Sequence, residues 1–203
     1  GGGTFALFVR DDGTGVFLGN TGGTAYLARK VAVEANGRVR FTANLTGNGE
    51  ATIAHGAVAG TFAGLALTGT RPSGATTAIA GFYQAGVTDS AATAYVIVGG
   101  GGQGYVLTQT GAQLAAGTAT VDSAGKLAAT VGGQTVAGTV TGSAVTGTVG
   151  PATFGGANDV VAGAQRFREI STRAAVPAGG SSTVGFVLTG DTPVDVLIRG
   201  IGP

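Results

Sequence analysis

The sequence contains two copies of one pattern, and a segment that precedes the second copy is lacking before the first. Residues 4–18 recur 89 residues later as residues 93–107, and the match continues to about residue 149 with small shifts in spacing that loop deletions explain. The aromatic segment 81–86 precedes the second copy, whereas three glycines precede the first. A β unit that lacks one strand has an open edge of unpaired backbone groups. The sequence therefore predicts an edge that another strand can complete.

Short runs of β-forming residues, separated by turn signals such as Asn36-Gly37, predict an all-β fold. Residues 51–70 and 135–150 alternate small apolar residues with Thr or Gly, which is typical of short antiparallel strands. We expect tandem duplicated antiparallel β units, the first spanning residues 1–80 without its opening strand and the second spanning residues 81–159. The alternation suits small barrels and sandwiches equally, so the sequence leaves that choice open.

The amino-acid composition of the chain changes from about residue 160. Residues 165–173 hold three of the nine arginines, and two strong strand candidates follow at residues 183–190 and 194–200. Two or three strands cannot bury both faces of a sheet alone. The sequence therefore predicts a short, incomplete, β-sandwich-like unit over residues 160–203.

Charged residues are scarce, at 10% of the 203 residues, against about 25% in ordinary proteins. Apolar residues make up 43% of the chain, which is too many for a disordered linker, and glycine occurs 41 times. Nearly neutral surfaces repel one another weakly, so this composition favours self-association. The net charge of +1 argues against a nucleic-acid partner, since phosphate binding needs clustered Lys and Arg.

Cysteine and methionine are both absent from the sequence. The lack of cysteine excludes disulfides and thiol chemistry, and it suits oxidising surroundings, where a free thiol is a liability. Because position 1 is not methionine, we expect either a processed chain, as after removal of a signal peptide, or a piece of a larger protein. No run of 18 apolar residues occurs, so no transmembrane helix is predicted. These features favour a secreted protein at the cell surface.

The C-terminal part of the chain carries a resemblance. The motifs I-S-T-R, G-F-V-L-T-G and V-L-I-R-G-I-G-P, within residues 165–203, resemble repeat segments of large secreted or surface-associated β-rich proteins of environmental bacteria. Residues 81–107 are similar to a stretch that often precedes these motifs in that family. The resemblance implies an exported, all-β, surface-associated protein, and it offers no catalytic residues to carry over.

Candidate chemical sites are few, and each has a simpler structural interpretation. The G-x-G-x-x-G motif at residues 99–104 is followed by a strand pattern, whereas dinucleotide binding needs a helix there, so the motif predicts a hairpin turn. His55 has no cysteine or second histidine to share a zinc ion and is predicted in a turn or at the surface. The turn Asp11-Asp12-Gly13 supplies too few carboxylates for calcium. We predict a non-enzymatic protein without a cofactor or bound metal.

The open edge, the incomplete last unit and the neutral surface lead to one hypothesis. The chain is a structural subunit of an extracellular filament or surface assembly, a homopolymer that grows head to tail by strand complementation. The donor strand or docking edge is expected in residues 5–9 or 194–198. Arginines 166 and 168 suit a solvated strand edge or an ion pair within the sheet; the alternative is a contact with a carboxylate, such as Asp11 or Asp12, or a row of carbonyls in a neighbour. The expected interface residues are Phe5, Leu7, Val9, Arg166, Arg168, Val194, Val196 and Ile198.

The alternative is a fragment of a large bacterial surface adhesin, in which the open ends are cut sites. It would act as a stalk or a carbohydrate-binding module for surface glycans. Exposed aromatic rings would favour sugar binding, and the candidates are Phe82, Tyr83, Tyr95 and Tyr105. An outer-membrane barrel is disfavoured because the sequence lacks aromatic girdles.

Overall fold

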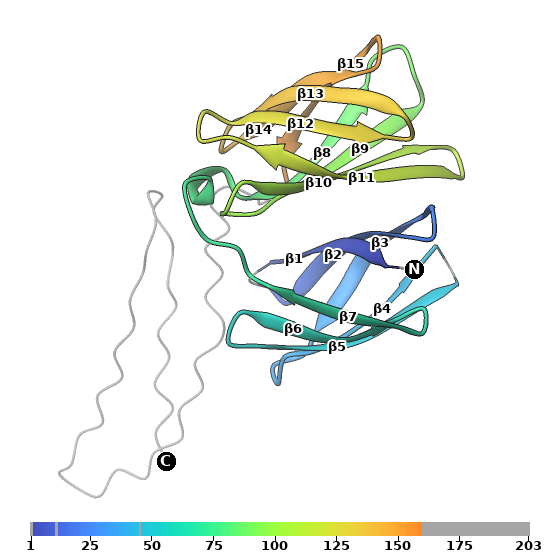
Figure 1. Cartoon of the computed structure of the whole chain (residues 1–203), viewed down its shortest axis with the longest axis vertical. Helices are drawn as coiled ribbons and strands as arrows, with labels where there is room; N and C mark the ends of the chain where they lie inside the picture. Colours follow the sequence, from blue (N-terminus) through green and yellow to red (C-terminus); the bar gives the residue numbers. More distant parts are fainter. Residues whose placement is uncertain (1, 11, 45, 160–203) are drawn as a thin grey trace, which may run out of the picture. The chain divides into compact units, whose positions relative to one another are not determined.

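The computed structural model describes residues 2–10, 12–44 and 46–159, and this part of the chain is all-β, which confirms the predicted fold class (Figure 1). It forms a seven-stranded sheet and a closed eight-stranded barrel. The sequence left barrel and sandwich open, and the second copy is a barrel. The expected C-terminal unit, residues 160–203, lies outside the described residues. No helix in the described part is long and apolar enough to cross a membrane.

Within the sheet and within the barrel, each strand pairs antiparallel with the next along the chain, and β15 also pairs with β8 to close the barrel. The seven-stranded sheet consists of β1 (Gly3–Val9), β2 (Thr14–Thr21), β3 (Thr24–Val33), β4 (Arg38–Ala43), β5 (Gly47–Ala54), β6 (Ala57–Phe62) and β7 (Leu65–Thr70). The barrel consists of β8 (Gly81–Val87), β9 (Ala92–Val98), β10 (Gln103–Thr110), β11 (Gln113–Val121), β12 (Lys126–Val131), β13 (Gln134–Val140), β14 (Ala144–Val149) and β15 (Ala152–Asn158). A short 3-10 helix, η1 (Thr77–Ile79), lies between them.

The sequence repeat corresponds strand by strand to this architecture. Strands β1 to β7 match β9 to β15 in order, and β8 is the barrel strand that has no counterpart in the seven-stranded sheet. The first shift in spacing arises in a β-bulge, because the pairing of β2 with β3 slips between Gly15 and Phe17. The second arises in a turn, which spans residues 44–46 in the first copy and 132–133 in the second. The expectation that loop deletions explain both shifts is therefore wrong for the first.

The interiors of the two units are filled differently. In the barrel, the interior cluster includes Tyr83 from β8 together with valines and alanines of the other strands. In the seven-stranded sheet, the corresponding cluster is aromatic: the Phe17 ring lies 4.5 Å from that of Phe41 and 4.8 Å from that of Phe62, measured between centroids. By the repeat, these three positions match smaller residues, Val106, Ala129 and Val149. Larger rings therefore occupy part of the space that β8 fills in the barrel.

A third apolar cluster joins the sheet to the barrel. The two copies contribute equivalent positions to it, which makes the contact approximately two-fold symmetric. The equivalent pairs are Ala6 and Tyr95, Phe8 and Ile97, Val16 and Tyr105, Leu18 and Leu107, Ala25 and Leu114, and Leu27 and Ala116. Phe82, also in this cluster, lies on β8 and so has no partner position in the described sheet.

Candidate strand-acceptor groove

Among the described residues, the seven-stranded sheet has two open edges where the barrel has a strand. In the barrel, β8 pairs with β9 on one side and with β15 on the other. The equivalent strands of the sheet are β1 and β7. Within residues 2–10, 12–44 and 46–159, β1 pairs with β2 alone and β7 with β6 alone. The backbone groups on these outer edges are therefore available to a further strand.

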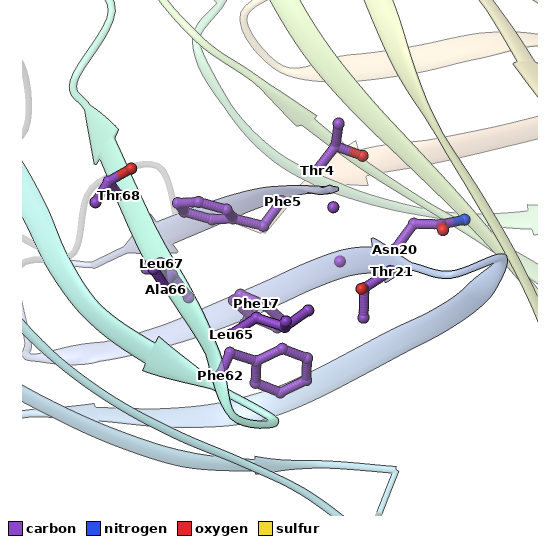
Figure 2. Close-up of a pocket in the computed structure, with 12 residues that line it drawn as sticks. Thr4, Phe5, Phe17, Asn20, Thr21, Phe62, Leu65, Ala66, Leu67 and Thr68 are labelled. Atoms are coloured by element: carbon purple, nitrogen blue, oxygen red, sulfur yellow. The ribbon is translucent and has the colours of Figure 1, made fainter. Parts of the chain in front are cut away.

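A groove lies between these edges (Figure 2), with a volume of about 140 Å³. That is close to the roughly 150 Å³ of an engineered apolar cavity that holds benzene. Its lining residues come from β1, β2, β7 and the end of β6, and none of them is charged. They are Gly3, Thr4, Phe5, Phe17, Gly19, Asn20, Thr21, Phe62, Leu65, Ala66, Leu67 and Thr68. Recognition in this groove would depend on backbone hydrogen bonds and apolar contacts.

Phe5 forms the inner wall of the groove. Its ring stacks on Phe17 with the centroids 6.0 Å apart, and in Figure 2 it points from β1 towards β7. On β7 the ring faces Gly69, where an ideal Cβ would lie 3.1 Å from Phe5 Cζ. Leu65, at the start of β7, keeps 42% of its surface exposed, whereas the other leucines that the structure describes are buried or half-buried. Phe5 thus covers the core beneath the groove, while the rim remains partly apolar and accessible.

Gly69 is equivalent to a position of the closed barrel that requires glycine. Its equivalent, Gly156, pairs with Ala85 of β8, and an ideal Cβ at Gly156 would lie 2.0 Å from the Gln84 carbonyl oxygen. That separation is impossible for real atoms, so β8 can approach β15 only because residue 156 has no side chain. At Gly69 the same Cβ would meet only ends of side chains, Phe5 Cζ and Val58 Cγ1. The open sheet therefore retains a glycine that suits a strand absent from its described residues.

Strand β1 is anchored from the barrel by Tyr105. The Tyr105 hydroxyl donates a hydrogen bond to the Thr4 carbonyl oxygen at 3.2 Å and lies 3.3 Å from Thr4 Oγ1. Burial raises the pKa of Tyr105 because the phenolate would lose its hydration, and the hydrogen bond with Thr4 partly opposes this. Arg10, just after β1, forms an ion pair with Asp159 and lies over the Phe82 ring. These contacts hold the groove's β1 edge in place.

A cluster of charges on β4 and β5 does not line the groove. Arg38 hydrogen-bonds and pairs with Glu50, and both effects lower the pKa of that carboxyl; Arg40 Nε lies 3.7 Å from the same Glu50 oxygen. Because Glu50 is exposed, solvent screens these interactions.

The structure describes three of the eight predicted interface residues, and the interface role of all eight stays a prediction. Phe5 and Leu7 lie on the inner side of β1 against the aromatic cluster, and Val9 is 36% exposed at the end of the strand. The remaining five are outside the described residues: Arg166, Arg168, Val194, Val196 and Ile198. Sequence reasoning missed the β7 side of the groove, although the match of Gly69 with Gly156 is a signal that could have indicated it.

The structure gives the other candidates structural roles. His55 lies exposed in the turn between β5 and β6, and residues 99–102 form the turn between β9 and β10. Thr76 holds that turn: its hydroxyl donates to the Gly99 carbonyl at 2.7 Å and accepts from Gly102 N at 2.8 Å. No group of three or more metal-ligating side chains occurs in the described part of the chain.

The four aromatic residues considered for sugar binding are buried, so they offer no free ring face to a glycan; they are Phe82, Tyr83, Tyr95 and Tyr105. Comparison with known protein families and with curated proteins finds no match for this chain.

Proposed function

We propose that this chain is a structural subunit of an extracellular filament or surface assembly, and that subunits join by strand complementation. The groove between β1 and β7 is the acceptor. A strand from the next subunit pairs with both edges and completes an eight-stranded barrel like that of β8 to β15. Because donor and acceptor occupy different places on the molecule, the contact is head to tail and propagates.

The observation that carries this proposal is the glycine at position 69. In the open groove a Cβ at Gly69 would press only on the ends of the Phe5 and Val58 side chains, at 3.1 and 3.3 Å, whereas an inserted strand would need the space that Gly156 provides for β8. The uncharged lining and the low charge of the chain support the same conclusion, since little repulsion opposes the approach of subunits. The extracellular location rests on the absence of cysteine and on the resemblance to secreted β-rich repeat proteins.

Electron microscopy of the negatively stained full chain, at several concentrations, tests the proposal. We expect fibres or sheets of regular repeat in the unmodified protein. We expect Gly69→Ala to give dispersed particles, because its Cβ would meet the inserted backbone. Gly86→Ala is the matched control, since an ideal Cβ at Gly86, on an outward position of β8, meets nothing within 4 Å. Dispersed monomers of the unmodified, folded chain at every concentration would contradict the proposal.

A further inference from the structure

We propose that the strand that completes the seven-stranded sheet is residues 185–190 of a second copy of this chain, in the register that β8 has in the barrel. This inference rests on the proposed function and identifies its donor segment. The sequence offered residues 5–9 and 194–198 as donor strand or docking edge; here residues 5–9 keep the role of docking edge, and residues 185–190 are the donor. Three features of β8 and of the residues around it point to this segment.

The first feature is the sequence of β8 itself. The barrel strand reads G-F-Y-Q-A-G at residues 81–86, and the C-terminal segment reads G-F-V-L-T-G at residues 185–190. Both glycines and the phenylalanine coincide, with no gap. Since β1 to β7 repeat as β9 to β15, the missing member of the first unit is expected to resemble β8, and this segment does.

The second feature is side-chain size on the inner face. In the barrel, Tyr83 and Ala85 of β8 point into the interior, and Tyr83 is its largest member. In the open sheet the interior is already filled by phenylalanines, so the incoming strand must present smaller side chains. Aligned with β8, residues 185–190 present Gly185, Val187 and Thr189 to the interior. Residues 194–198 would present either Val194, Val196 and Ile198 or the pair Asp195 and Leu197, which are bulkier or charged.

The register follows from the pairs of β8. Tyr83 lies opposite Val96 of β9, and Ala85 lies opposite both Ala94 of β9 and Gly156 of β15. Transferred through the repeat, Val187 lies opposite Leu7, and Thr189 lies between Phe5 and Gly69. The backbone at Thr189 thus meets the one β7 position that lacks a side chain.

The third feature is the unmatched member of the apolar cluster between sheet and barrel. Phe82 packs there against Phe8 and Tyr95, with ring centroids 6.1 and 6.2 Å apart. Every other barrel position of this cluster has an equivalent in the sheet. In the proposed register, Phe186 takes the place of Phe82, beside Ala6 and Ile97. One residue would then complete the approximate two-fold symmetry.

Disulfide crosslinking between full-length chains tests the register, because the native chain has no cysteine and therefore no background reaction. Adjacent antiparallel pairs alternate between wide and narrow Cα spacing, so two pairs are needed. We mix the single variants Ala6→Cys with Leu188→Cys, and Leu7→Cys with Val187→Cys, allow assembly, oxidise gently and separate the products on a non-reducing gel. The control replaces the second partner by Leu197→Cys.

The expected result is a crosslinked dimer from at least one in-register mixture and little from the Leu197→Cys control. If the unmodified chain assembles but the Ala6→Cys and Leu7→Cys variants crosslink only to Leu197→Cys, the donor assignment is overturned and strand complementation stands. If the double variant Ala6→Cys/Leu188→Cys closes within one chain and the mixtures give no dimer, the segment fits the groove in its own subunit, and both the second-copy donor and the polymer are overturned. A chain that forms no crosslink in any of these combinations also overturns the donor assignment.

Discussion

Gly156 and Ala85 lie opposite each other in the barrel, so close that an ideal Cβ on Gly156 would be 2.5 Å from the Ala85 Cα. The absence of one side chain thus allows β15 and β8 to close the barrel. The equivalent of Gly156 in the open sheet is Gly69, and the Phe5 ring is its neighbour. Glycine thus occupies equivalent positions in the closed barrel and in the open sheet, and the barrel shows that a strand can pack closely against it.

Alanine at these two glycines should therefore have unequal effects on the free energy of unfolding. We expect Gly156→Ala to destabilise the monomer by about 1–3 kcal/mol, as overpacking does, because backbone must move. Gly69→Ala should cost less, since only the end of the Phe5 ring has to shift. Urea unfolding monitored by circular dichroism measures both. Equal losses of stability would show that Gly69 serves the folded monomer and not an inserted strand.

The aromatic cluster should account for much of the stability of the open sheet. Phe17 is buried between Phe41 and Phe62, so Phe17→Ala should lower the free energy of unfolding by about 3–5 kcal/mol. The control is Val106→Ala, at the equivalent buried position of the barrel, where fewer atoms are lost. A larger cost at Val106 would contradict the view that aromatic rings substitute for the missing strand.

The hydroxyl of Tyr105 should matter for the order of β1. Tyr105→Phe removes the hydrogen bond to the Thr4 carbonyl and should cost about 0.5–1.5 kcal/mol. Amide hydrogen exchange should become faster in β1, with β12 to β14 unaffected. Tyr26→Phe is the control, because the Tyr26 ring packs edge-on against Phe62 in the other cluster. Unchanged exchange in β1 would show that the cluster around Phe8 is sufficient to hold the strand.

Stability should fall at alkaline pH through the buried tyrosines. Burial raises the pKa of Tyr83 and of Tyr105 in the folded state, whereas both titrate near 10 in the unfolded chain. The unfolded state therefore loses these protons first. The contribution of the two tyrosines to the free energy of unfolding is constant below about pH 10 and decreases as pH rises through their pKa values in the folded state. Thermal unfolding between pH 8 and 11.5 measures this decrease.

Tyr83→Phe isolates one contribution to that decrease. The Tyr83 hydroxyl donates to the carbonyls of Ile79 and Thr141, at 2.7 and 2.9 Å, so the variant should lose stability at neutral pH and show a shallower alkaline decrease. An alkaline slope identical to that of the unmodified chain would exclude Tyr83 as a source.

The amino-acid sequence by itself determined the all-β fold and the tandem duplication, and it predicted that the first copy lacks an opening strand. These are local or periodic properties: turn signals such as Asn36-Gly37, alternation with period two, and the repeated spacing of apolar residues. They follow from backbone geometry and need no knowledge of long-range contacts. The sequence also indicated β1 as one side of the candidate site, because the gap in the repeat falls directly before it.

Only the tertiary structure decided that the second copy closes into a barrel and that β7 forms the other side of the groove. Closure depends on β8 meeting β15, whose pairing residues Tyr83 and Asn158 are far apart in the chain, and period-two alternation is the same in open and closed sheets. The burial of Tyr95 and Tyr105, which removed them as sugar-binding candidates, likewise arises from packing between the two copies. Contacts between distant strands are not encoded in any local pattern, so the structure was needed to show them.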